Sequence, residues 1–293
     1  MYRSRIPLSK RIILVAVLMA GTTPVSSEET AHGGTPQTTL KVPAPEPPRD
    51  PSAESSPIRP VLAMAVNGYK RVRAEVDDYT CVVVRRERVG GKLGPHEFIY
   101  GKVRHRRTQN GRVVVPFSVY LKFLKPRTVA GRELLYVEGK NNGEIWARRG
   151  GTRFAFVTMK LDPNGDLAMR GNRHPITEFG VEKLLYRLAE SARRDLFAPC
   201  DVEYLQDASI NGVPATGVVV TQKYPSEDRD YYQARIFVDK DKSLPLHYET
   251  YGWPKSPGES PELLEQYTYT NLNLNVGLTD ADFSEDNPQY QVK

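Results

Sequence analysis

The chain has 293 residues, of which 39% are hydrophobic and 26% are charged, and its formal net charge is +6 at pH 7. This composition is that of an ordinary folded protein, and it excludes a chain that is disordered throughout. The positive charge permits nucleic-acid binding, but charge at this level is more often a feature of solubility than a binding site.

The N-terminal residues have the three parts of a secretory signal peptide. Four basic residues precede an apolar run at 12–20, and small and polar residues follow it. A run of this length is too short to span a bilayer comfortably. We therefore expect residues 1–27 to be a signal peptide that exports the protein to the periplasm or cell envelope. Cleavage is expected after Ser27 or near Gly21, and the alternative is a retained signal anchor.

Cleavage would change the charge argument. Removal of the four basic residues leaves a net charge of about +2, so we expect no nucleic-acid partner. Residues 28–60 are then dominated by Pro, Thr, Ser, Glu and Ala and contain almost no large apolar side chain. Such a segment buries too little surface to fold, and we expect a Pro-rich disordered linker. No comparable break follows, so residues 61–293 are expected to form a single domain.

The chain has two cysteines, Cys81 and Cys200. In an exported protein they could form a disulfide, and closing so long a loop would contribute about 4 to 5 kcal/mol in the chain-entropy model. The equal alternative is two buried free thiols, because Cys81 lies in a strand pattern where cysteine packs as a small hydrophobe. No CxxC, HxxxH or HExxH spacing is present, so we expect no metal site and no cofactor.

Two amphipathic helices are predicted. Residues 60–76 place apolar side chains at helical spacing, and Pro60 suits the first turn of a helix. Residues 175–196 repeat this pattern, with Pro175 in the first turn and basic residues near the end. Both helices are long enough to cover part of a sheet.

Strand patterns account for most of the remaining residues. Short connections cannot hold crossover helices, so neighbouring strands must be antiparallel. About eleven such strands cannot stay flat and open. We predict an α+β fold, in which two amphipathic helices cover the concave face of a strongly curved, incomplete antiparallel β-barrel of about eleven strands. The predicted strands lie at 79–89, 97–107, 113–124, 132–139, 144–149, 152–161, 202–210, 211–224, 231–240, 244–253 and 263–276.

Alternating apolar residues in several strands are candidates for a lipid-binding face. Successive side chains of a strand point to opposite faces, so every second residue from 117 to 123 shares one face. Packing beneath the helices explains these residues, and an unfilled concavity would make them an apolar binding site. The lipid-facing candidates are Phe117, Val119, Leu121, Phe123, Tyr136, Trp146, Phe154 and Phe156.

Two basic regions are candidates for anion binding. Arg170, Arg173 and His174 precede the second helix, whose first amides could receive a phosphate or carboxylate. In the alternative, Asn172 or His174 caps the helix and the arginines pair with acidic neighbours. The basic residues at 85–107 form a stripe, which is either a solvated outer face or a peripheral contact with anionic lipid head groups.

Catalysis is not expected. The five histidines are accompanied by no recognisable nucleophile motif such as GxSxG. The adjacent acids Asp77 and Asp78 are typical of a solvated turn, and no set of residues meets the criteria for an active site.

Several stretches resemble known families. Similarity to the periplasmic outer-membrane lipoprotein-sorting carriers is found in FSVYLKFLKPRTVAGRELLYV, FVDKDKSLPLHYETYG and LTDADFSE. A closer resemblance, to an exported bacterial family known as domain of unknown function number 1571, common in planctomycete-type bacteria, is found in DYTCVVVRRERVGGKL, PFSVYLKFLKPRTVAGRELLYVEGKNNGEI and LDPNGDLAMRGNRHPITEFG. The resemblance implies a lipoprotein-carrier-like half-barrel and adds no catalytic residues. Charged residues within several strands depart from the carrier pattern.

Two functional hypotheses follow. The first is an exported non-enzymatic protein that binds a lipid, an acyl chain or a lipoprotein in the concavity of the half-barrel. The alternative is an envelope interaction or stress-sensing module with a filled core and no lipid cargo, whose partner is another envelope protein. Neither hypothesis specifies an oligomeric state.

Overall fold

The computed structural model describes residues 56–227, 229 and 231–293. The signal peptide expected at 1–27, and all of the expected linker except its last five residues, lie outside this part of the chain. Ile58 is buried and helix α1 (Arg59–Glu75) begins at the next residue, so folded structure begins slightly before residue 61.

Helix α1 owes its position to a narrow apolar stripe. Its buried residues are Val61, Ala65, Gly68 and Val72, which recur every three or four positions and therefore share one side of the helix. Pro60 lies in the first turn, where its missing N–H has no intrahelical acceptor to lose. The prediction of a helix in this region is confirmed.

The second long helix, α3 (Val181–Arg194), begins later than the sequence pattern indicates. A 3-10 turn at Ile176–Glu178 precedes it. Gly180 lies between this turn and the helix and has a φ of 111°, which is not helical. A Cβ atom on Gly180 would lie 2.5 Å from the Tyr79 hydroxyl oxygen. That oxygen accepts a hydrogen bond of 3.0 Å from the backbone amide of Val181. The expected start at Pro175 is therefore wrong, because this close approach requires glycine.

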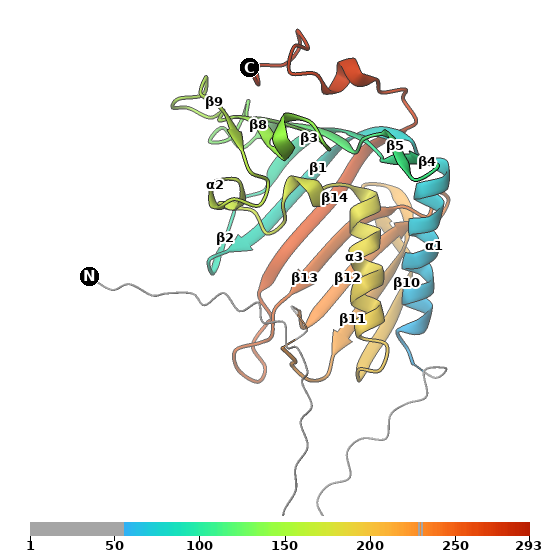
Figure 1. The fold of residues 1–293 in the computed structure, drawn as a ribbon. Helices are drawn as coiled ribbons and strands as arrows, with labels where there is room; N and C mark the ends of the chain where they lie inside the picture. Colours follow the sequence, from blue (N-terminus) through green and yellow to red (C-terminus); the bar gives the residue numbers. More distant parts are fainter. Residues whose placement is uncertain (1–55, 228, 230) are drawn as a thin grey trace, which may run out of the picture. The chain divides into compact units, whose positions relative to one another are not determined.

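One large antiparallel sheet contains both halves of the chain (Figure 1). Its strands run in the order β10-β11-β12-β13-β14-β1-β3-β6-β7-β8-β9, and β2 pairs with β1. The strands of the first half are β1 (Asp78–Val89), β2 (Lys92–Leu93), β3 (Glu97–Arg104), β6 (Ser118–Lys125), β7 (Glu133–Val137), β8 (Ile145–Arg148) and β9 (Thr158–Leu161). Those of the second half are β10 (Cys200–Ile210), β11 (Val213–Gln222), β12 (Gln233–Asp239), β13 (Pro245–Tyr251) and β14 (Leu263–Leu274).

The first strand of the first half, β1, pairs with the last strand of the second half, β14. Strand β1 is antiparallel to β14, from the pair Tyr79 and Leu274 to the pair Glu87 and Glu265. Strands β9 and β10 remain at the two edges, so the sheet curves strongly without closing into a barrel. The predicted fold class is confirmed, with twelve strands in the sheet where about eleven were expected.

A separate hairpin corrects one predicted strand. Strands β4 (Arg107–Gln109) and β5 (Arg112–Val115) form their own two-stranded sheet. The sequence pattern indicated one strand over 113–124, but β5 ends before Pro116, and β6 begins two residues after it. Proline has no backbone N–H to donate, so it commonly interrupts a strand.

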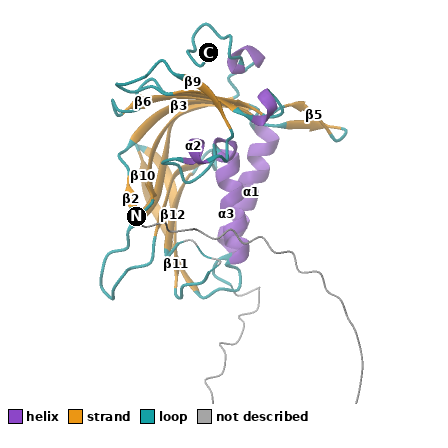
Figure 2. Cartoon of the chain, turned by 60° about the vertical axis from the view of Figure 1, so that its left-hand side comes forward, coloured by secondary structure: helices purple, strands orange, loops and turns teal. Residues whose placement is uncertain are grey.

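The two long helices lie side by side across the open, concave side of the sheet (Figure 2). They approach closely at Gly68 of α1, where an added Cβ atom would lie 3.1 Å from a methyl carbon of Leu185 on α3. A third helix, α2 (Asp166–Met169), has a single turn. In the described part of the chain, no helix combines the length and apolar character needed to cross a membrane.

The C-terminal tail covers part of the convex face. After β14 the chain forms a 3-10 turn, Asp280–Phe283, and Phe283 is buried against the sheet. Tyr290 stacks on Tyr120 with 3.7 Å between the ring centroids. Lys102 contacts Asp282 at 2.8 Å, which adds an ion pair to the apolar contact. This packing of the tail was not predicted from the sequence.

Candidate functional site: an apolar cavity beneath the helices

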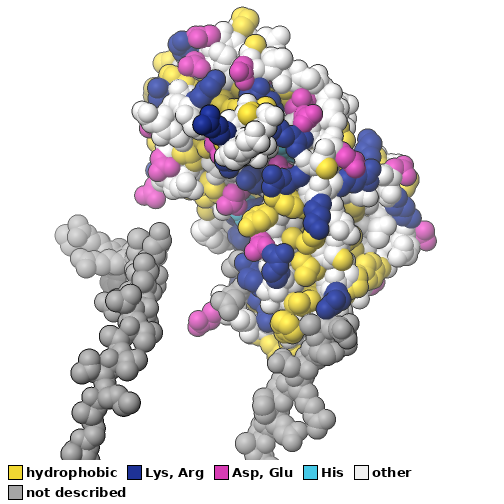
Figure 3. Space-filling model, turned by 45° about the vertical axis from the view of Figure 1, so that its right-hand side comes forward, with side chains coloured by type: hydrophobic (Ala, Val, Ile, Leu, Met, Phe, Trp, Pro, Cys, Tyr) yellow, Lys and Arg dark blue, Asp and Glu magenta, His cyan; other side chains and the backbone are white. Residues whose placement is uncertain are grey.

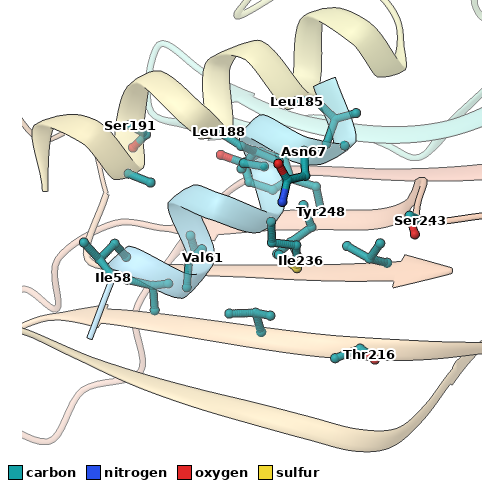
Figure 4. Close-up of a pocket in the computed structure, with 18 of the residues that line it drawn as sticks. Ile58, Val61, Asn67, Leu185, Leu188, Ser191, Thr216, Ile236, Ser243 and Tyr248 are labelled. Atoms are coloured by element: carbon teal, nitrogen blue, oxygen red, sulfur yellow. The ribbon is translucent and has the colours of Figure 1, made fainter. Parts of the chain in front are cut away.

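A cavity of about 380 Å³ lies between helices α1 and α3 and strands β11 to β13 (Figure 4). Its lining is mainly aliphatic, as is usual for binding sites for small apolar ligands. The aliphatic residues of the lining are Ile58, Val61, Met64, Ala65, Leu185, Leu188, Ala192, Val218, Val220, Ala234, Ile236 and Val238.

Strand alternation explains how the sheet supplies this lining. Val218 and Val220 on β11 point to the helices, as do Ile236 and Val238 on β12, and all four are buried. The register pairs Val218 with Ile236, so the four side chains form a continuous apolar floor. The cavity therefore lies on the half of the sheet formed by the second half of the chain.

Small side chains on the helices leave the space open. Ala65 and Gly68 on α1 and Ala192 on α3 face the cavity, where leucine or phenylalanine would fill it. Figure 3 shows apolar side chains on the lower half of the side where α1 lies, with Lys and Arg side chains among them.

One end of the cavity has charged side chains of both signs. Arg71 and Lys240 line it together with Ser243, whose hydroxyl oxygen accepts a hydrogen bond of 3.3 Å from Arg71. Asp239 is also present, but its carboxylate accepts hydrogen bonds from the backbone amides of Asp241 and Lys242 at 2.8 and 2.9 Å. Asp239 thus stabilises a turn, and Arg71 also pairs with Glu75 at 2.9 Å, which leaves Lys240 as the second basic group near the cavity.

The other end of the cavity has a buried hydrogen-bond network. Asp195 is 1% exposed, and its carboxylate accepts hydrogen bonds from the Tyr231 hydroxyl at 2.8 Å and the Gln222 amide at 2.7 Å. Arg229 donates a third at 3.0 Å. Burial, followed by the nearby charge of Asp195, raises the pKa of Tyr231, so Tyr231 stays a neutral donor.

Four of the predicted lipid-facing residues lie on the concave face but in its filled half. Phe117, Val119, Leu121 and Phe123 are buried in a cluster with Leu184 and other residues of α3. Tyr136 packs against the same cluster. A space of about 70 Å³ remains beside Leu121 and Phe123, and Phe123 also lines a pocket of about 370 Å³ next to strands β8 and β9. Helix packing, the simpler explanation of these residues, fits this half of the sheet.

The other three candidates lie elsewhere. Trp146 packs on the convex face beside the C-terminal tail. Phe154 and Phe156 are 60% and 77% exposed. They lie in the connection between β8 and β9, because only residues 158–161 of the expected strand at 152–161 pair with a neighbour. Their assignment to the concave face is therefore wrong.

The candidate anion-binding residues meet acidic partners. His174 contacts the Glu265 carboxylate at 2.6 Å, and Arg173 contacts it at 3.5 Å. Burial raises the pKa of Glu265, but the hydrogen bond from His174 and the surrounding positive charges outweigh it, and the pKa is lowered overall. Arg170 is exposed and lines a different pocket. Arg173 and His174 thus have the acidic neighbours that the alternative describes, but its prediction that Asn172 or His174 caps the helix is wrong, because Gly180 is the N-cap residue.

The basic stripe at 85–107 is also largely paired. Arg85 contacts Glu97 at 2.8 Å, Arg104 contacts Asp280 at 2.7 Å, and Arg107 contacts Asp77 at 2.7 Å. These carboxylates reduce the charge that the stripe offers to a lipid surface.

Both cysteines are free and buried, in two separate apolar clusters. Four strands lie between β10, which carries Cys200, and β1, which carries Cys81, so the Cα atoms are too far apart for a bridge. Burial raises the pKa of Cys81 to about 12 and also raises that of Cys200. Among the described residues, no group of three or more His, Cys, Asp or Glu side chains could hold a metal ion.

Thiol accessibility tests this arrangement. Because the reactive thiolate is suppressed and buried, we expect less than about one tenth of the alkylation rate of an exposed thiol for both cysteines in the native protein. Urea should expose two thiols without a reductant. Mass spectrometry after iodoacetamide treatment counts them, and a count of zero in urea would contradict the free-thiol arrangement.

The curved antiparallel sheet, with helices across its open side and an apolar cavity beneath them, defines an α+β half-barrel. A family model with the description "Protein of unknown function (DUF1571)" matches residues 76–292, and the chain belongs to this family. Among curated proteins, none matches the sequence.

Solved structures show looser similarities. A DUF1329 family protein from Desulfovibrio piger is 17% identical, with a TM-score of 0.39 and coverage of 79% of this chain and 98% of that chain. MucB in the Pseudomonas aeruginosa MucA/MucB complex is 17% identical, with a TM-score of 0.40 and coverage of 76% and 60%. A LolA superfamily protein from Nitrosomonas europaea is 12% identical, with a TM-score of 0.31 and coverage of 77% and 98%. Because each TM-score is below 0.5, the function has to be argued from this chain's own residues.

Proposed function

We propose that this is an exported, non-enzymatic protein that binds one acyl chain in the cavity beneath α1 and α3. The observation that carries the proposal is the cavity of about 380 Å³ with its aliphatic lining. Protein interiors are normally packed without large voids, so a space of this size implies a ligand.

The size of the cavity limits the ligand. If each methylene takes about the volume of one water in the liquid, roughly 30 Å³, the cavity holds roughly a dozen such groups. That corresponds to a single acyl chain of medium length. The several chains of a lipoprotein would not fit unless the helices moved.

The polarity of the cavity orients the ligand. Arg71 and Lys240 lie at one end, where they would attract the carboxylate or phosphate of a head group. The acyl chain of the ligand would extend from this end of the cavity along Ile236 toward Ile58. We expect a preference for anionic single-chain lipids over neutral ones.

Direct measurement tests the proposal. The protein purified from its native envelope should carry a single-chain lipid detectable by mass spectrometry after gentle extraction. After delipidation it should bind a fluorescent fatty acid with a stoichiometry of one. If it carries no lipid and binds no fatty acid, the lipid-binding proposal is overturned.

Filling the cavity should abolish binding without unfolding the protein. In Ala65→Leu the new side chain occupies space beside Leu185, and we expect at least a tenfold loss of fatty-acid affinity. Ala74→Leu is the matched control, because Ala74 lies on the exposed side of the same helix. Fluorescence titration and thermal unfolding measure both effects. Equal affinities in the two variants would place the ligand elsewhere.

A second function is favoured by the filled half of the concave face. Its packed cluster around Phe123 suits an envelope interaction or stress-sensing module that needs no cargo. In that case the delipidated protein would bind no fatty acid and would instead bind another envelope protein. Both proposals share residues 1–27 as an export signal, 28–60 as a linker and 61–293 as the working domain.

A further inference from the structure

Two neighbouring segments at the β8–β9 edge of the sheet carry positive charge and no negative charge. Residues 125–132 contain three basic residues, and residues 148–160 contain four, while neither segment contains Asp or Glu. We call these two segments together the Arg-Phe edge. Its basic residues are Lys125, Arg127, Arg132, Arg148, Arg149, Arg153 and Lys160.

The two segments are joined by close backbone packing. The amide of Gly151 donates a hydrogen bond of 2.8 Å to the carbonyl oxygen of Ala130. Cβ atoms on Gly150 and Gly151 would lie 2.0 Å from the Arg132 amide nitrogen and 2.4 Å from the Thr128 carbonyl oxygen. Both glycines also have positive φ values, so the base of the 149–157 loop is held firmly.

This base presents two aromatic side chains to solvent. Phe154 has a φ of 54°, a conformation that is unusual for a bulky residue. The amide of Val157 closes the turn on the Phe154 carbonyl oxygen at 3.1 Å. Phe154 and Phe156 are 60% and 77% exposed, the highest exposed fractions among the phenylalanines that the structure describes. Neighbouring exposed phenylalanines on a rigid turn are typical of a contact surface.

The charges of the edge are not neutralised by the protein. Across the part of the chain that the structure describes, none of its seven basic residues has an ion pair, unlike the stripe at 85–107. Arg149 instead lies over the Phe154 ring, 5.6 Å from its centroid. Burial lowers the pKa of Arg132, and the charges of Arg85 and Arg149 lower it further despite the opposing effect of Glu97. Repulsion among cations favours an external anionic partner.

We propose that the Arg-Phe edge docks the protein on an anionic lipid bilayer. Phe154 and Phe156 enter the boundary between head groups and acyl chains, where aromatic rings are favoured. The exposed basic residues of both segments, such as Arg127 and Arg153, meet the lipid phosphates. Each adds to the attraction while it lies within a Debye length of the surface. A protein partner would fit this surface less well, because it would have to supply many carboxylates in one plane.

A second pocket lies directly beside the edge. It has a volume of about 370 Å³ and is lined by Arg132, Arg148 and Arg149 together with Leu134 and Met159. A docked bilayer would therefore face an opening with cationic walls and an apolar interior. Strands β8 and β9 lie away from α1 in Figure 1, so docking leaves α1 facing away from the lipid.

Vesicle cosedimentation tests the proposal with the protein recovered from its native envelope. Wild type should bind vesicles of phosphatidylcholine with phosphatidylglycerol at least about tenfold more tightly than vesicles of phosphatidylcholine alone, and added salt should weaken the binding. The double variant Phe154→Ser/Phe156→Ser should lose at least about tenfold in affinity for the anionic vesicles. Arg149→Gln/Arg153→Gln should lose affinity for anionic vesicles only.

The matched control is Phe197→Ser, which removes a 53% exposed phenylalanine just after the C-terminal end of α3. It should bind anionic vesicles as wild type does. All variants carry the same N-terminal segment, so any contribution from that segment cancels. Equal binding by wild type and the Phe154→Ser/Phe156→Ser variant would overturn the proposal. Wild-type self-association through these residues, with no vesicle binding, would overturn it too.

The two proposals can fail separately. The Phe154→Ser/Phe156→Ser variant changes exposed side chains, so its unfolding temperature and its fatty-acid affinity should match those of wild type. Ala65→Leu should lose fatty-acid binding and keep vesicle binding. A loss of both activities in either variant would contradict two independent surfaces.

Discussion

Replacing Asp195 by alanine is expected to lower the free energy of unfolding by about 3 to 5 kcal/mol, because it leaves a buried charge without its partner. Arg229 would lose the carboxylate that it contacts at 3.0 Å. The Tyr231 hydroxyl and the Gln222 amide would lose their acceptor at the same time. Urea unfolding followed by circular dichroism measures the loss.

A conservative variant separates charge from hydrogen bonding at this site. Asp195→Asn keeps one carbonyl oxygen for Tyr231 and Gln222 but removes the negative charge that faces Arg229, so we expect about half of the alanine effect. Arg229→Ala in the Asp195→Asn background should then cost less than Arg229→Ala alone. Purely additive losses would contradict an ion pair between Asp195 and Arg229.

Asp195 also connects stability to the cavity. It follows directly after α3 as the C-cap residue, and Tyr231, which it holds, lines the cavity. Loss of Asp195 should free Tyr231 to move into the space near Ile58. We therefore expect Asp195→Ala to weaken fatty-acid binding more than the matched distant change Asp286→Ala, which lies in the exposed tail.

The strand and helix pattern was accessible from the sequence because periodicity is a local property. Apolar residues at helical spacing predicted α1, and Phe117 to Phe123 alternate, so the elements and the curved sheet follow directly. The buried face of α1 does not follow, because the predicted stripe ran through Leu62, Val66 and Tyr69 and the structure buries Val61, Ala65 and Gly68. Pro116, which ends the strand pattern in the structure, is also visible in the sequence. Its interruption of the 113–124 pattern was missed because apolar residues continue on both sides of it.

The location of the cavity was not accessible in the same way. Alternation places both Phe123 and Val218 on the concave face, and only the position of the helices decides which side chains are covered by large neighbours. The small residues Ala65 and Ala192 were the available signal, because facing alanines leave space. Their importance emerges only when both helices are known to cross the same strands.

The division of the concave face into two halves has a physical origin. The half beneath the start of α3 meets large side chains such as Leu184, which is buried in one cluster with Phe123. The half beneath the end of α3 meets Ala192, and the valines of β11 cannot reach across. Leu188 and Tyr248 pack against both halves, and Glu265 belongs to a polar cluster beside them.

Glu265→Ala is the second substitution with a large expected effect, also about 3 to 5 kcal/mol of unfolding free energy. The Glu265 carboxylate is buried and faces His174 at 2.6 Å and Arg173 at 3.5 Å. Its pKa is affected by Arg187 as well, and Tyr267 donates a hydrogen bond to it at 3.2 Å. The carboxylates that remain nearby are Glu87 on the neighbouring strand and Glu178, which contacts His174 and Arg187 at 3.7 Å.

The pH dependence of stability identifies this carboxylate. The pKa of Glu265 in the folded protein is lowered from its ordinary value of 4.5, so its contribution is fully present above pH 4.5. It is lost as the pH falls through the lower folded value, because the folded state then has to take up a proton that the unfolded state already holds. Glu265→Gln should be less stable than wild type at neutral pH.

Comparing wild type with Glu265→Gln separates the contribution of Glu265 to the pH dependence from the contributions of the other acidic residues. The difference in unfolding free energy between wild type and Glu265→Gln should stay constant from neutral pH to about 5 and shrink below it. Asp286→Gln is the control, since its exposed carboxylate contacts only Lys293 at the end of the chain. A difference that stays constant into strong acid would mean that the charge of Glu265 does not stabilise the fold. The polar cluster around Glu265 would then stabilise the fold through hydrogen bonding alone.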